Sequence, residues 1–160
     1  MVKVNNIPIN YYSLFPSDTR RKDVIISIKP RYVEKILNKE KIYEFRKIVF
    51  KENNIRNIYI YASSPIKKIV AICEFEKIIE GTPEEVWEVC KDYAGISEQE
   101  FFSYFNNREK AYSIKLKNIQ KLESGFDPYK LIKNFRPPQS FMYADINFIL
   151  SVRQSSYSLH

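Results

Sequence analysis

The residues that build most metal and nucleophile sites are scarce in this chain. Its 160 residues include one histidine, two cysteines and three glycines. The histidine is His160, the last residue, and the cysteines, Cys73 and Cys90, lie apart within apolar patterns. A zinc site of the His/Cys type and a Ser-His-Asp or Cys-His nucleophile both need more than this. The glycines form neither a P-loop nor a dinucleotide fingerprint. We therefore expect no metal and no cofactor, and most familiar enzyme classes are excluded.

Long hydrophobic runs are also missing. The longest ones, such as residues 58–62 and 148–150, are far shorter than the roughly 20 residues that span a bilayer. Residues 1–16 lack the basic region and apolar stretch of a signal peptide. Two isolated cysteines indicate reduced core thiols rather than a disulfide framework. These features predict a cytoplasmic protein without a membrane partner.

Positive charge is concentrated in one part of the sequence. Residues 20–68 contain 14 Lys and Arg against 5 Asp and Glu, whereas the remainder has 12 basic and 14 acidic residues. Such segregation creates a one-sided positive field that suits a polyanion such as RNA. A lysine-rich surface produced by an AT-rich genome is the alternative explanation. The charge pattern alone leaves both open.

Strands outnumber helices in the residue pattern. Alternation or β-branched runs predict strands over residues 24–28, 43–48, 58–62, 68–79 and 112–116. Apolar stripes predict short helices over residues 31–37, 83–92 and 98–105, and another from residue 128. Thr82 with Glu85 and Ser97 with Glu100 have the spacing of capping boxes. The pattern predicts an α+β domain over residues 23–145, a mainly antiparallel sheet or small barrel, with an N-terminal arm (1–22) and a C-terminal tail (146–160).

One segment resembles a known family signature. Residues 39–46, Lys-Glu-Lys-Ile-Tyr-Glu-Phe-Arg, resemble the Gly-x-Lys-x-x-Glu-x-Arg motif of ASCH domains, which follows a first short helix. Residues 26–30, 61–65 and 137–141 also fit that family, so the resemblance covers residues 24–143. It implies a PUA-like β-barrel with short peripheral helices. Lys39 stands where the family has glycine, so the turn after the helix must form without it.

The resemblance also implies a site. ASCH domains are associated with RNA metabolism, and their cleft is lined by the signature residues, here Lys41, Glu44 and Arg46. The other matching segments add Ser63, Ser64, Gln139 and Ser140 as candidates for binding RNA or a modified nucleotide. Some members remove acyl groups from N4-acylated cytidine with a threonine nucleophile. In that case Lys41, Glu44 and Glu85 are the catalytic candidates, although Glu44 replaces the threonine.

The residues themselves leave alternatives open. Glu44 and Arg46 are two apart on a predicted strand, so they share a face and can pair. Their pair could hold a guanidinium for phosphate recognition, or it could be a salt bridge that stabilises one end of the sheet. Aromatic candidates for base stacking, each equally explicable as core, are Tyr59, Tyr61, Tyr112, Phe141 and Tyr143. Three functions remain: an RNA- or nucleotide-binding domain, a nucleoside amidohydrolase, and a regulatory protein-interaction domain.

Overall fold

A curved six-stranded sheet forms the centre of the structure, a computed structural model that describes residues 21–52 and 54–155. The strands are β1 (Lys22–Ile28), β2 (Tyr43–Arg46), β3 (Ile55–Ala62), β4 (Lys68–Gly81), β5 (Ala111–Phe126) and β6 (Phe141–Ala144). Their order is β2-β5-β4-β3-β1-β6. The β1–β3 pair is parallel and the other neighbours are antiparallel. The predicted mixed, mainly antiparallel α+β sheet is confirmed.

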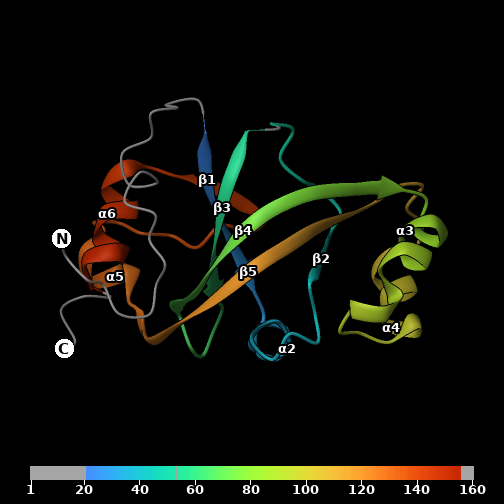
Figure 1. Cartoon of the computed structure of the whole chain (residues 1–160), viewed down its shortest axis with the longest axis horizontal. Helices are drawn as coiled ribbons and strands as arrows, with labels where there is room; N and C mark the ends of the chain where they lie inside the picture. Colours follow the sequence, from blue (N-terminus) through green and yellow to red (C-terminus); the bar gives the residue numbers. More distant parts are fainter. Residues whose placement is uncertain (1–20, 53, 156–160) are drawn as a thin grey trace.

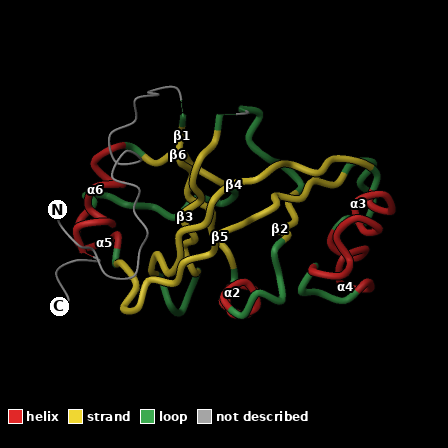
Figure 2. Tube along the Cα trace, viewed as in Figure 1, coloured by secondary structure: helices red, strands yellow, loops and turns green. Residues whose placement is uncertain are grey.

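Short helices cover the two ends and the lower face of this sheet. They are α2 (Pro30–Leu37), α3 (Pro83–Cys90), a 3-10 turn (Lys91–Tyr93), α4 (Glu98–Tyr104), α5 (Pro128–Leu131) and α6 (Ile146–Ser155). The long strands β4 and β5 run across the molecule, with α3 and α4 at one end and α5 and α6 at the other (Figure 1). Figure 2 shows the same separation, with α2 below the middle of the strands. No helix of the described residues is long and apolar enough to cross a membrane.

Three hydrophobic clusters hold these layers together. The first lies between α2 and the sheet, where Val33 and Ile36 pack on β1 and β3. The second joins α6 to the sheet through Phe148, Ile149 and Val152. The third joins α3 and α4 to β2. Helix α6 falls within the residues predicted as a C-terminal tail, and the sequence pattern did not predict it. The predicted arm, residues 1–22, lies outside the described residues apart from its last two positions.

The predicted barrel is wrong, because the sheet is not closed. Strands β2 and β6 are its two edges, each only four residues long, and they do not pair with each other. Side chains bridge the gap instead. Arg46 on β2 donates to the backbone oxygens of Ser27 on β1, at 2.5 Å, and of Ser140 beside β6, at 3.3 Å. Phe50 and Phe141 pack edge to face across the same gap. We call this gap between the edge strands β2 and β6, bridged by Arg46, the seam. The site described below lies at the seam.

The turn that leads into β2 forms at the residue where the family has glycine. Lys39 has a φ of +63°, in the left-handed region that favours glycine. Its N–H donates to the oxygen of Ile36, and the N–H of Glu40 donates to the oxygen of Lys35. These two bonds form a Schellman motif that ends α2. The helix therefore ends in a tight turn with a lysine at the left-handed position.

We expect Lys39→Gly to raise the free energy of unfolding by up to about 1 kcal/mol, because a left-handed residue with a side chain is strained. Lys35→Gly is the control, since Lys35 lies inside the same helix, where glycine should destabilise by about 1 kcal/mol. Urea denaturation of both variants measures the difference. If Lys39→Gly lost as much stability as Lys35→Gly, Lys39 would not be a strained left-handed residue at the end of α2.

Candidate functional site

A cavity of about 250 Å³ lies at the open seam of the sheet. The first turn of α2, strand β2 and helix α4 form its walls. Its lining residues are Ser27, Ile28, Lys29, Tyr32, Lys41, Glu44, Phe45, Arg46, Ile96, Glu100, Tyr104 and Gln139. The structure thus brings together the three signature residues and Gln139, which are separated by almost a hundred positions in the chain.

Lys41 is a buried cation on the wall of this cavity. The residue is only 2% exposed, and its Nζ donates to the backbone oxygen of Ala94 at 2.8 Å. The same nitrogen is 3.8 Å from Oε2 of Glu44 and 4.5 Å from the centre of the Phe45 ring. Burial lowers the pKa of Lys41, and the charge of Glu44 opposes that shift. The hydrogen bond to Ala94 and the nearby Glu44 carboxylate compensate part of the cost of burying this amine.

Glu44 lies between two cations. Its Oε1 is 3.1 Å from Nη2 of Arg46, and its side chain is 9% exposed. Both Nη atoms of Arg46 also donate to backbone oxygens at the seam, and its buried Nε has no acceptor among the described residues. The predicted shared face of Glu44 and Arg46 is therefore present in the structure. The guanidinium is engaged by the protein, so it holds the seam and adds positive charge beneath the cavity.

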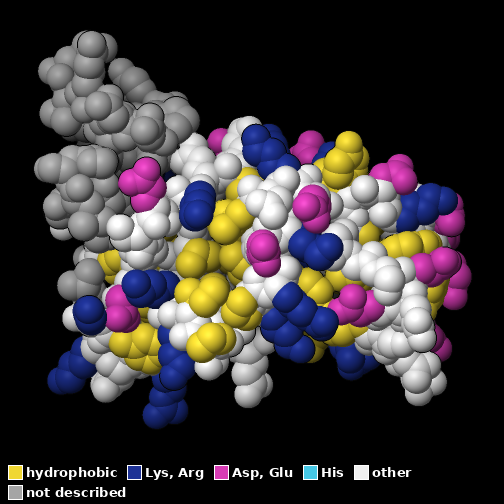
Figure 3. Space-filling view, turned by 90° about the horizontal axis from the view of Figure 1, so that it is seen from below, with side chains coloured by type: hydrophobic (Ala, Val, Ile, Leu, Met, Phe, Trp, Pro, Cys, Tyr) yellow, Lys and Arg dark blue, Asp and Glu magenta, His cyan; other side chains and the backbone are white. Residues whose placement is uncertain are grey.

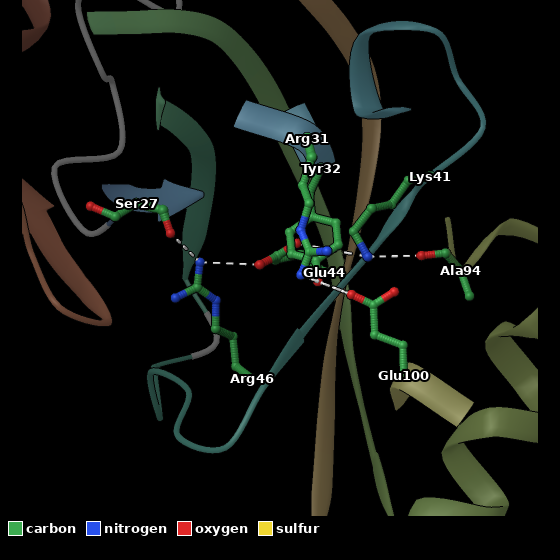
Figure 4. A network of polar contacts seen from close by, with 8 residues as sticks. All are labelled: Ser27, Arg31, Tyr32, Lys41, Glu44, Arg46, Ala94 and Glu100. Carbon is green, nitrogen blue, oxygen red and sulfur yellow. Dashed lines mark hydrogen bonds and ion pairs between the residues drawn. The ribbon is translucent and has the colours of Figure 1, made fainter. Parts of the chain in front are cut away.

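A second polar group, made by Tyr32, Arg31 and Glu100, lies beside the group of Lys41, Glu44 and Arg46 (Figure 4), and Nζ of Lys41 is 5.7 Å from the centre of the Tyr32 ring. Tyr32 on α2 donates to Glu100 on α4, and Arg31 reaches both, with its Nη2 2.6 Å from Oη of Tyr32 and 3.0 Å from Oε1 of Glu100. Burial and the hydrogen bond to Glu100 raise the pKa of Tyr32 to about 12. The phenol therefore stays protonated at neutral pH and acts as a donor.

The sequence interpretation missed this second group because it assigned Glu100 to a capping box. At α3 the predicted box is complete: Thr82 accepts from Glu85, and the Glu85 carboxylate accepts from Thr82. At α4 only half of it forms, since Ser97 accepts from the Glu100 N–H while the carboxylate turns to Tyr32. The available signal was the i, i+4 spacing of Glu100 and Tyr104, which places both on one face of α4.

The turn between α3 and α4 holds Lys41 in place. The oxygen of Tyr93 accepts from the N–H of Ile42, and that of Ala94 accepts from Nζ of Lys41. Gly95 has a φ of +66°, and a Cβ there would be 2.5 Å from Cβ of Lys41. Glycine is therefore needed both for the backbone angle and for the close approach of the lysine stem. This turn makes α3 and α4 part of the site.

The remaining predicted residues are distributed more widely. Ser140 belongs to the seam, where its oxygen accepts from Arg46 and its Oγ is 3.5 Å from the oxygen of Ile48. Ser63 and Ser64 lie at the turn after β3 and do not line the cavity. Glu85 is exposed and caps α3, also outside the cavity.

The predicted stacking aromatics do not line the cavity either. Tyr59 and Tyr61 are buried in the second hydrophobic cluster. Tyr112, Phe141 and Tyr143 are partly exposed on strands and are not among the lining residues. The cavity instead contains Tyr32, Phe45 and Tyr104. Among the described residues, no group of three or more His, Cys, Asp or Glu side chains could hold a metal ion.

Comparison with known proteins identifies the family to which this fold belongs. The family described as a domain of unknown function (DUF365) matches residues 21–134. An ASCH domain-containing ribonuclease from Zymomonas mobilis subsp. mobilis is 32% identical over 125 residues, which cover 77% of this chain and 84% of the relative. The chain belongs to the ASCH domain family, as its signature predicted.

Solved structures agree with this assignment. The crystal structure of ASCH from Zymomonas mobilis matches with a TM-score of 0.76 and 27% sequence identity, covering 84% of this chain and 95% of that chain. A mutant of the same protein matches with a TM-score of 0.77 and covers 84% of this chain and 96% of that chain. Nearly the whole length of the relative is therefore represented in the described fold.

Replacing Glu44 should leave two buried cations without their shared carboxylate. We expect Glu44→Gln to lower the free energy of unfolding by roughly 3 kcal/mol, the usual effect of removing one partner from a buried ion pair. Glu88→Gln is the matched control, because Glu88 pairs with Lys91 at the same three-residue spacing on an exposed surface and should change stability little. Urea denaturation compares the two. Equal losses of unfolding free energy in the two variants would show that burial does not strengthen the ion pairs of Glu44.

The lowered pKa of Lys41 predicts a pH dependence. Burial disfavours the charged amine in the folded state, so stability rises as pH increases through the folded pKa toward the ordinary value of 10.5. The difference in unfolding free energy, wild type minus Lys41→Met, should therefore increase over that range. The thiol of Cys73, whose pKa burial raises to about 12, has the opposite effect but is present in both proteins. A difference that stays constant or falls with pH, measured by denaturation at several pH values, contradicts the assignment.

Proposed function

We propose that this chain binds single-stranded RNA, with one nucleotide in the seam cavity, and cleaves it there. The observation that carries the proposal is the similarity to a protein named a ribonuclease, which extends over 84% of that relative and includes the folded core. The cavity supplies the physical support. A space of about 250 Å³ admits one nucleotide but not a duplex, so the substrate must be unpaired at this point.

The charge around the cavity favours an anionic ligand. Lys29, Arg31, Lys41 and Arg46 outnumber the carboxylates Glu44 and Glu100 by two. Lys41 and Arg46 lie beneath the surface and are held by protein oxygens. Arg31, 63% exposed where it contacts Glu100, and the exposed Lys29 are the cations that can contact a phosphate directly. The buried cations add a positive potential behind them.

Tyr104 gives the cavity a surface on which a base can stack. Its side chain is 39% exposed, and the ammonium of Lys47 lies 4.7 Å from the ring centre. Aromatic rings beside cations are the usual platform for unpaired bases. Tyr104 and Glu100 share a face of α4, so a stacked base would bring its ribose and phosphate close to the Tyr32–Glu100 pair.

These groups can perform RNA cleavage through the 2′-hydroxyl. The Glu100 carboxylate accepts the 2′-hydroxyl proton while the O2′–P bond forms. The P–O5′ bond breaks, and the phenol of Tyr32, protonated at neutral pH, donates to the departing oxygen. The proton that Glu100 took then passes to the Tyr32 oxygen across their hydrogen bond, which restores both groups. The products are a 2′,3′-cyclic phosphate and a free 5′-hydroxyl. Arg31 and Lys41 stabilise the additional negative charge on the phosphorus oxygens.

A second candidate is hydrolysis of an N4-acylated cytidine. The favourable observation is that a carboxylate, Glu100, lines the same cavity as Lys41. Glu85, the glutamate considered from the sequence, lies outside it. Glu44 occupies the position of the threonine nucleophile and is engaged by two cations. We therefore place this activity second to RNA cleavage.

The proposal predicts that Glu100→Gln retains RNA affinity but loses cleavage by about 10²–10⁴-fold, as expected for a group that moves a proton. Arg31→Gln should weaken binding and reduce the slope of log affinity against log salt by roughly 0.7. Fluorescence anisotropy and gel analysis with a labelled single-stranded oligoribonucleotide measure both effects, with Glu88→Gln as the unaffected control.

Two results would overturn this function. One is undetectable binding of the single strand at low salt, and the other is affinity equal to that for duplex DNA. Release of the acyl group from N4-acetylcytidine in a parallel assay, without RNA cleavage, would support the second candidate.

A further inference from the structure

A second hollow lies on the other side of α2 from the cavity. It has a volume of about 610 Å³ and runs between the outer face of α2 and strands β4 and β5. We propose that this hollow, the α2 groove, carries the RNA strand onward from the cavity. This inference rests on the proposed function and adds the path that the strand takes outside the site.

The groove and the cavity meet at the first turn of α2. Lys29 and Tyr32 line the cavity, whereas Pro30, Arg31 and Val33 line the groove. Arg31 joins the two hollows, because it lines the groove and its guanidinium contacts Tyr32 and Glu100, which line the cavity. A phosphate bound by Arg31 would therefore lie between the two hollows. A strand with one nucleotide in the cavity has the groove as its adjoining path.

Cations border the groove on both sides. Arg31 lies on the α2 side, and the exposed Lys68 and Lys121 lie on β4 and β5. Glu34 and Glu123 also line it, so the net charge is positive but small. Figure 3 shows the face of the molecule that contains α2, with Lys and Arg side chains on both sides of a hydrophobic area. This arrangement suits a phosphate backbone that follows the rim.

The floor between these cations is apolar. Leu37, Ile66, Val70 and Leu122 line it, and Ile66 is 42% exposed. Exposed apolar surface inside a hollow with a charged rim is typical of a ligand surface. None of the described residues that line the groove is aromatic, so these residues cannot stack bases as Tyr104 can. We therefore assign it contacts with sugar edges and phosphates that are independent of base identity.

The test compares a dinucleotide with a decamer, both with 2′-O-methyl riboses so that the 2′-oxygen cannot attack. The variant Lys68→Gln/Lys121→Gln removes two groove cations. The variant Lys91→Gln/Lys110→Gln removes two exposed cations that do not line either hollow. Calorimetric titration at several salt concentrations measures the affinity of each protein for each oligonucleotide.

We expect the groove variant to bind the decamer on the order of tenfold more weakly, with a salt slope reduced by roughly 1.4, or 0.7 for each lost phosphate contact. Its affinity for the dinucleotide, and both affinities of the control variant, should match wild type.

Equal loss of decamer affinity in the two variants, or no loss in either, contradicts the proposed path along the groove but not the proposed binding in the cavity. Failure of wild type to bind either oligonucleotide overturns the proposed function itself. An acidic peptide that binds the groove variant less tightly than wild type, when the decamer does not, would assign the groove to a protein partner.

Discussion

The buried array of Lys41, Glu44 and Arg46 is the interaction on which the rest of the site depends. A single carboxylate lies between two cations, and removing charges from water is costly unless each one is paired and hydrogen-bonded. Backbone oxygens meet that requirement: Ala94 accepts from Lys41, and Ser27 accepts from Arg46. These partners come from three separate parts of the chain. The array can therefore form only when β1, β2 and the α3–α4 turn are all in place.

The need to bury Lys41 with hydrogen-bond partners gives the two short helices after β4, α3 and α4, a structural role. Alone, β2 would leave Lys41 open to solvent with an ordinary amine pKa. The α3–α4 turn covers it, and Gly95 allows the backbone to lie directly against its side chain. Packing of Phe101 against Phe45 fixes α4 to β2. The same helix then presents Glu100 to the cavity, so the burial of Lys41 and the second polar group have one structural origin.

Local features of this fold were predictable because they depend on neighbouring residues. The alternation of Glu44 and Arg46 predicted their shared face, and Thr82 with Glu85 predicted the cap of α3. The sequence also indicated a turn after the first helix that forms without the family glycine, and Lys39 makes that turn with a positive φ. Contacts between distant segments were not predictable in this way. Nothing near Glu100 in the sequence indicates that its carboxylate meets Tyr32, 68 positions away, instead of completing a local cap.

The open seam is the reason that this fold has a cavity between its edge strands. A closed barrel of this size would fill its interior with side chains and pair every edge. Here the two edge strands do not pair with each other, and Arg46 spans the gap with its side chain. A side-chain bridge leaves space that a continuous hydrogen-bond ladder would not, and the cavity occupies that space. The sheet therefore departs from the predicted barrel and contains a cavity for the same reason: the Arg46 side chain bridges the seam in place of backbone pairing. The same bridge places positive charge beneath the cavity.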